Sequence, residues 1–179
     1  MNAYETTRAW SDCETPIGRL TLTAGDDGLD GLHFPGRAPV RDEAAHSPAR
    51  FERAVEQLYD YFTGRRTRFE LDIDLPSGTP FQQEVWNQLL LIPYGETVSY
   101  SQLAARLGRT DRVRAVGAAV GRTPLPIIVP CHRVIGSDGS LTGYLGGLHR
   151  KQGLLDLEAA VSQGREAPSS FAPRQLALL

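Results

Sequence analysis

The stretch "PIIVPCHRVIG" (residues 126–136) is an apolar run, punctuated by prolines, that contains an adjacent cysteine and histidine. Such a run is typical of chain that passes through a protein interior, so it should hold Cys131 and His132 in a fixed place. The chain has only two cysteines, Cys13 and Cys131, which excludes a disulfide framework and predicts two free thiols in a reducing compartment. The feature to explain is therefore a lone cysteine placed directly before a histidine.

Cys131 has the chemistry of a nucleophile. A thiol of ordinary pKa, about 8.5, is only a few per cent thiolate at neutral pH, and a nearby imidazole can take its proton. Side chains of sequence neighbours often point apart, so His132 is expected to reach the sulfur through a water or a turn. A buried structural cysteine is the alternative. No second cysteine or histidine lies at zinc-ligand spacing, and the adjacent histidine argues against a papain-like hydrolase.

Two short helices are predicted before this stretch. Ser99 should cap a helix that ends at Gly108, and Asp111 should cap a second helix over residues 112–122. Two helices joined by a glycine-containing turn resemble a helix-turn-helix. The second helix is rich in glycine and alanine, although each glycine weakens a helix interior by about 1 kcal/mol. Its backbone should therefore approach something closely, either another helix or a DNA backbone.

The first part of the chain predicts strands and one helix. Residues 19–24 and 29–34 read as strands around a turn, and apolar residues at helical spacing over 51–62 predict an amphipathic helix. Polar and apolar residues alternate over 67–75, which predicts a further strand. An N-terminal lobe of antiparallel sheet plus helix, residues 1–76, is expected.

A domain boundary is predicted at "PSGTP" (76–80). Thr79 can cap a helix there, with a proline at its first position. A last helix is predicted from about residue 148 to about residue 160. We therefore expect a second domain over residues 77–160, followed by a flexible tail over 161–179.

Composition and charge describe an ordinary water-soluble chain with one basic segment. The net charge is −2, 41% of residues are hydrophobic, and no run of about 18 apolar residues predicts a membrane span. The N-terminus lacks a secretory pattern, so cytoplasm is the expected location. Between Tyr100 and Arg133, Asp111 is the one acid among six arginines: 106, 109, 112, 114, 122 and 133. This segment could meet a polyanion, or it could be a solvated arginine surface.

Four motifs in order, "IPYGETVSYSQLAARLG" (92–108), "RAVGAAVGR" (114–122), the cysteine stretch and "GYLGG" (143–147), resemble the O6-alkylguanine-DNA alkyltransferases. The resemblance implies a two-lobe α+β fold. Its N-terminal lobe would be a ribonuclease-H-like antiparallel sheet with a helix. Its C-terminal lobe would be mostly helical, winged-helix-like, and would contain the helix-turn-helix. It also implies irreversible transfer of an alkyl group from O6-alkylguanine in double-stranded DNA to Cys131. Each molecule would act once, with no cofactor and no metal, and O4-alkylthymine stays open as a second substrate.

The resemblance also implies a role for each matching residue. His132 would relay the proton of Cys131 through water, and Glu158 would orient the imidazole. Tyr100 would hydrogen-bond the base, while Arg114 would fill the gap left by a flipped nucleotide. The residues expected against DNA are Arg114, Ala115, Gly117, Ala118, Gly121, Arg122, Ser99 and Thr123. The residues expected to line the base and alkyl pocket are Tyr144, Leu145, Gly146 and Val134.

Two positions depart from the family pattern. Thr123 stands where the family usually has asparagine, and a hydroxyl has one donor where an amide has two, so slower transfer is expected. Leu145 stands where a small residue is usual, which predicts a narrower alkyl pocket. A second function stays open: a sensor that binds alkylated DNA without reacting, although such relatives replace the nucleophile. A thiol hydrolase or redox protein without a DNA role is the third. A monomer is expected, and clustering on DNA is left open.

Overall fold

The computed structural model describes residues 8–75 and 78–171. Its N-terminal lobe contains a three-stranded antiparallel sheet of β1 (Ala9–Thr15), β2 (Gly18–Gly25) and β3 (Gly28–His33), in that order. The strands β2 and β3 confirm the prediction for this part of the chain. β1 was not predicted, because its sequence, AWSDCET, is poor in β-branched residues. Full-length pairing with β2 compensates for that weak propensity.

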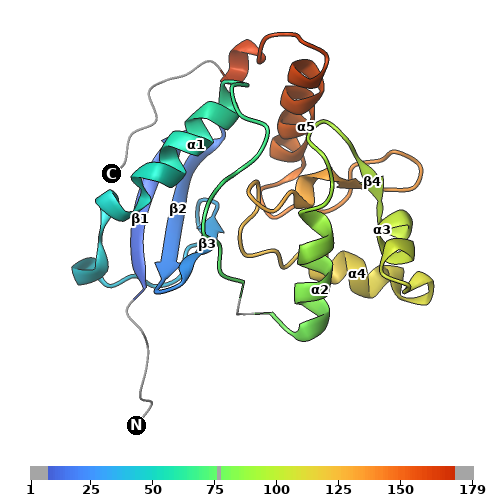
Figure 1. Cartoon of the computed structure of the whole chain (residues 1–179), viewed down its shortest axis with the longest axis horizontal. Coiled ribbons are helices and arrows are strands. Elements are labelled where there is room, and N and C mark those ends of the chain that lie inside the picture. Colours follow the sequence, from blue (N-terminus) through green and yellow to red (C-terminus); the bar gives the residue numbers. More distant parts are fainter. Residues whose placement is uncertain (1–7, 76–77, 172–179) are drawn as a thin grey trace.

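A single long helix, α1 (Glu52–Phe62), lies across the sheet (Figure 1) and confirms the predicted amphipathic helix. It follows the short 3-10 turns Glu43–Ala45 and Pro48–Phe51. Its inner side chains, among them Tyr61, are buried in the core. The chain leaves the helix at Gly64, whose φ of 74° is a conformation that favours glycine.

The strand predicted over residues 67–75 is wrong. The segment is extended, and alternate residues do pack against the core, but its one ladder contact is a bridge between Ile73 and Leu29 of β3. Farther along β3, the amide of Leu32 donates to the carbonyl of Pro124 instead. The side chain of Gln57 bonds both the amide and the carbonyl of Glu70. The alternation of polar and apolar residues therefore predicted correctly which side chains are buried. No strand forms, because the backbone groups hydrogen-bond to other partners.

The C-terminal lobe contains four helices within the described residues: α2 (Pro80–Leu89), α3 (Tyr100–Arg106), α4 (Val113–Val120) and α5 (Leu148–Ser162). Thr79 and Ser99 each form the predicted capping box at the start of α2 and α3. A two-stranded parallel pair joins β4 (Val98–Ser99) to β5 (Val134–Ile135). α4 packs against α2 and α3, so the helix-turn-helix arrangement of α3 and α4 is present.

Asp111 does not cap the second helix of this pair. It lies within a 3-10 turn, Thr110–Arg112, and no side chain caps α4. Because the turn begins before Asp111, its carboxylate is carried around to an exposed side, 3.9 Å from Arg112.

The lobes pack together and include part of the predicted tail. The sheet and α1 lie on one side and α2, α3 and α4 on the other (Figure 1), which confirms the two-lobe α+β prediction. α5 runs on to Ser162, and a 3-10 turn, Ser169–Phe171, buries Phe171 in a stack on Phe62 of α1. Residues 161–171 are thus not a free tail, and residues 172–179 lie outside the described part. Within the described chain, no helix is long and apolar enough to cross a membrane.

Candidate active site

Cys131 begins a 3-10 turn, Cys131–Arg133, between a buried apolar segment and β5. The residue is 3% exposed, so the predicted delivery of this cysteine to the interior is confirmed. Ile127, four residues earlier, has a φ of 80° and is the one residue other than glycine with positive φ in the described chain. Its backbone N–H and that of Cys131 lower the pKa of the Cys131 thiol, and the Cys131 N–H donates to the Val129 carbonyl at 2.7 Å.

Burial raises the pKa of Cys131 to about 11. The Thr123 hydroxyl beside the sulfur and the positive charge of Lys151 act in the opposite direction but do not outweigh the loss of solvent. The unbound protein therefore carries a neutral thiol. The site that shelters the sulfur also removes the water that would solvate its charge.

His132 is completely buried and hydrogen-bonded through one ring nitrogen only. Its Nε2 lies 2.8 Å from Glu158 Oε1, while Nδ1 is buried without a partner among the described residues. Burial lowers the pKa of His132, although Glu158 opposes this. Glu158 accepts a hydrogen bond from the Nε2–H of the neutral ring, which leaves the Nδ1 lone pair free to accept a proton.

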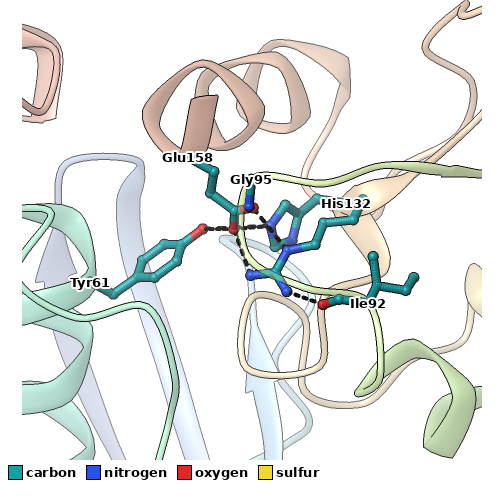
Figure 2. A network of polar contacts seen from close by, with 6 residues as sticks. Tyr61, Ile92, Gly95, His132 and Glu158 are labelled. Carbon is teal, nitrogen blue, oxygen red and sulfur yellow. Dashed lines mark hydrogen bonds and ion pairs between the residues drawn. The ribbon is translucent and has the colours of Figure 1, made fainter. Parts of the chain in front are cut away.

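Glu158 accepts hydrogen bonds at both oxygens. Oε1 accepts from Tyr61, His132 and Arg133 at 2.7, 2.8 and 2.9 Å. Oε2 accepts from Arg133 Nε at 2.8 Å and from the backbone N–H of Gly95 at 3.1 Å (Figure 2). Burial alone would raise the pKa of Glu158, but the hydrogen bonds of His132 and Arg133 outweigh it and lower the pKa to about 2. The carboxylate therefore stays ionised and fixed.

Lys151 is a buried cation that ties the predicted pocket loop to β5. Its ammonium donates to the carbonyls of Val134, Thr142 and Gly143 at 2.6, 2.9 and 3.4 Å. The Tyr100 hydroxyl donates to the same Thr142 carbonyl at 3.1 Å, and the ammonium lies 5.9 Å from the Tyr100 ring. The loop carbonyls and the phenol predicted to contact the base are thus held in one cluster.

Of the predicted pocket residues, Tyr144 lies near His132, and the other three are described by different contacts or by their burial. The Tyr144 ring lies 6.5 Å from His132, and its hydroxyl is buried without a partner among the described residues. Gly146 lies so close to Phe34 of the N-terminal lobe that a Cβ there would be 2.7 Å from the ring. Leu145 is half-buried in the same loop. The side chain of Val134 lies wholly in the core, and its carbonyl accepts from Lys151 instead.

The outward face of α4 is made of small residues between two arginines. The inward residues, among them Ala119, pack in the core, and Trp86 of α2 donates to the Ala119 carbonyl. Gly117 is half-buried against Tyr100. Helix packing and an open outer surface therefore both apply to this helix. The exposed predicted DNA-binding residues are Arg114, Ala115, Ala118, Gly121 and Arg122.

Three further residues are not on this face. Ser99 and Thr123 are 9% and 2% exposed, because one caps α3 and the other closes the last turn of α4 through a hydrogen bond to Val120. They cannot contact DNA directly through their side chains. Arg133, counted in the basic segment, is buried against Glu158, so it adds no surface charge.

Tyr61, Arg133 and Lys151 were missed as members of this site. Lys151 shares a helical face with Leu154 and Glu158, so a lysine at core spacing was a usable signal. Tyr61 gave no such signal, because a tyrosine in an amphipathic helix is normally a packing residue and its partner is 97 positions away. Among the described residues, no group of three or more His, Cys, Asp or Glu could hold a metal ion.

Comparison with known proteins agrees with this geometry. Residues 4–75 match the ribonuclease-like domain of 6-O-methylguanine DNA methyltransferase, and residues 80–160 match its DNA binding domain. The methylated-DNA–protein-cysteine methyltransferase of Mycobacterium tuberculosis is 49% identical over 147 residues, 81% of this chain and 88% of the relative. The inducible enzyme of Bacillus subtilis is 47% identical over 135 residues, 75% of this chain and 72% of the relative.

The fold is shared as well. The crystal structure of Mycobacterium tuberculosis OGT in complex with DNA superimposes with a TM-score of 0.76 at 44% identity, over 90% of this chain and 98% of that one. The structure of the Pyrococcus kodakaraensis O6-methylguanine-DNA methyltransferase gives a TM-score of 0.62 at 25% identity, over 78% and 92%. The resemblance seen in the four motifs is thus confirmed, and the chain belongs to the methylated-DNA–protein-cysteine methyltransferase family.

Proposed function

We propose that this protein repairs DNA by moving the alkyl group of O6-alkylguanine onto Cys131, irreversibly and once per molecule. The observation that carries the proposal is the arrangement at Cys131. A buried thiol adjoins a neutral histidine in the chain, and the ring of that histidine has one nitrogen fixed by Glu158 and the other free. A carboxylate that orients an imidazole beside a nucleophile is the general arrangement for activating a thiol.

The proposed reaction is an in-line displacement. The thiol proton passes through a water to Nδ1 of His132, and the sulfur electron pair forms a bond to the alkyl carbon. The bond between that carbon and O6 breaks, and its electron pair leaves with the guanine. The Tyr100 hydroxyl hydrogen-bonds the base and helps neutralise the departing anion. The thiol pKa of about 11 means that ionisation is coupled to substrate binding and does not precede it.

For DNA, we propose that the small outer face of α4 enters the minor groove and that Arg114 fills the place of the flipped nucleotide. Supporting this, Ala115, Ala118 and Gly121 are exposed and leave the helix slim. A narrow groove accepts only small side chains, and base flipping costs a few kcal/mol that an inserted side chain can offset. The homologue solved with DNA supports DNA as the partner.

Finer parts of the proposal follow the same reasoning. Leu145 in the pocket loop should disfavour bulky alkyl groups, and the division into residues 1–76 and 77–160 should separate a supporting lobe from the reacting one. The protein should act as a monomer. Two free buried cysteines are compatible with a reducing compartment such as the cytoplasm.

Mass spectrometry after incubation with a duplex containing O6-methylguanine tests the proposal. The peptide that carries Cys131 should gain the mass of one methylene. Cys131→Ser should bind the duplex without gaining mass, whereas Cys13→Ser should react like wild type. Binding of the duplex by wild type with no mass gain would favour the sensor, and a mass gain in Cys131→Ser would refute the assigned nucleophile.

A further inference from the structure

Tyr61 is the point at which the N-terminal lobe touches the acid–base pair of the C-terminal lobe. The residue is 1% exposed, and its hydroxyl donates to Glu158 Oε1 at 2.7 Å. The same oxygen lies 2.8 Å from His132 Nε2, and that nitrogen is 3.5 Å from the Tyr61 hydroxyl. Figure 2 shows Tyr61 and His132 both directed at the Glu158 carboxylate.

Packing does not account for the hydroxyl. The Tyr61 ring contacts the rings of Phe62, Phe69 and Tyr94 at centroid distances of 5.4, 5.4 and 5.9 Å, and a phenylalanine would make the same contacts. A hydroxyl buried in an aromatic cluster is unfavourable unless it is hydrogen-bonded. This hydroxyl has one proton, and it is given to Glu158. The role of the Tyr61 hydroxyl is therefore its hydrogen bond to the Glu158 carboxylate.

The donated proton changes what Glu158 can do for His132. Each hydrogen bond to Oε1 takes up part of the negative charge that would otherwise stabilise a proton on the imidazole. We propose that Tyr61 is a positioning residue, which holds Oε1 against His132 and weakens its pull, so that the ring stays neutral with Nδ1 free. The inference rests on the proposed roles of Cys131 and His132, and it makes the N-terminal lobe part of the reacting centre.

The other groups around this pair do not replace Tyr61. Arg133 and Lys151 lower the pKa of His132 as burial does, whereas Glu158 is the group that raises it. Loss of the Tyr61 hydroxyl therefore leaves Glu158 a stronger partner for an imidazolium and should raise the pKa of His132. The titratable and charged groups that face the pair are Tyr61, Tyr94, Cys131, Arg133, Tyr144 and Lys151.

The test compares Tyr61→Phe with Tyr59→Phe, a half-buried tyrosine of the same helix whose ring stacks under Arg65. Single-turnover methyl transfer from an O6-methylguanine duplex is measured between about pH 5 and about pH 9. In Tyr61→Phe the acid limb of the rate profile should move about one unit toward higher pH, since a hydrogen bond to a charged group is worth about tenfold or more. The alkaline plateau should fall less than about threefold, and Tyr59→Phe should follow wild type.

Titration of the His132 ring by NMR in the protein without DNA gives a second, independent readout. Its pKa should rise in Tyr61→Phe alone. The proposal would be overturned if the acid limbs of the rate profiles and the His132 titrations were the same in all three proteins. An equal rate loss at every pH would also overturn it, because that result indicates packing damage. If wild type failed to alkylate Cys131, the proposed function would fall, while the ring titration would still decide what Tyr61 does to His132.

Discussion

The outer face of α4 and the buried His132–Glu158 pair belong to the same lobe and are built in opposite ways. The face consists of exposed small residues and arginines that make few internal contacts. The pair has five hydrogen bonds converging on one carboxylate, within side chains that are almost wholly buried. Substitutions on the face should therefore change DNA binding and leave folding intact, whereas substitutions at the pair should lower both the transfer rate and the stability. Four predictions test that separation.

The largest effect is expected for Glu158→Gln, which leaves the Arg133 guanidinium buried without its carboxylate. Breaking a buried ion pair from one side costs about 3–5 kcal/mol, so the free energy of unfolding should fall by about that amount. Transfer should drop more than about a hundredfold, because His132 loses the charged, acceptor-only group that fixes its tautomer. Denaturant unfolding and single-turnover rates measure the two losses. The exposed Glu96→Gln is the matched control, and equal stability of the two variants would contradict the prediction.

The same carboxylate predicts acid sensitivity. The pKa of Glu158 is about 2 in the folded protein, below the usual 4.5, so the unfolded chain binds the proton more readily. Its contribution to stability is complete above about pH 4.5 and is lost as the pH falls toward about 2. Wild type should lose more stability than Glu158→Gln across that window.

A smaller, selective effect is expected for Arg114→Ala. Transfer from duplex DNA should fall about tenfold or more, because nothing then compensates for the cost of flipping the base. Transfer from the free base O6-methylguanine should not change, and the free energy of unfolding should stay within about 0.5 kcal/mol of wild type. Arg112→Ala, also exposed, serves as the control for lost charge alone. Equal losses on duplex and free base would show that Arg114 acts on the reacting centre instead.

The smallest effect is expected for Thr123→Asn, at the point where the two regions meet. The Thr123 hydroxyl has one proton, which it must share between the Val120 carbonyl, 2.8 Å away, and the sulfur of Cys131, whose pKa it lowers. An amide has two donors and can serve both groups. The single-turnover rate should rise about threefold, while Thr123→Val should lower it. An unchanged or slower rate in Thr123→Asn would show that Thr123 does not limit ionisation of the sulfur.

Short-range features of this structure could be predicted from the sequence, and long-range ones could not. The capping boxes at Thr79 and Ser99 depend on residues three positions apart, and the cysteine segment carries its own apolar pattern. In contrast, residues 67–75 do not form the predicted strand, because distant parts of the chain take up the hydrogen bonds. The hydrogen-bond partner of Tyr61 lies 97 positions away. No local pattern indicates which distant side chain will donate to the same carboxylate oxygen as His132. Hydrogen bonds that cross the two lobes depend on the packing of finished helices.

The backbone conformation of Ile127 has a consequence for any attempt to raise the thermal stability of this protein. A β-branched residue with φ of 80° lowers the stability by about 1–3 kcal/mol relative to glycine. Screens for thermostable variants should therefore find Ile127→Gly. Yet the backbone N–H of Ile127 is one of the groups that lower the pKa of Cys131, the proposed nucleophile. A more stable Ile127→Gly variant would hold this backbone N–H less rigidly and would stabilise the developing thiolate less. If each molecule transfers one alkyl group, as proposed, no later turnover can offset a slower reaction.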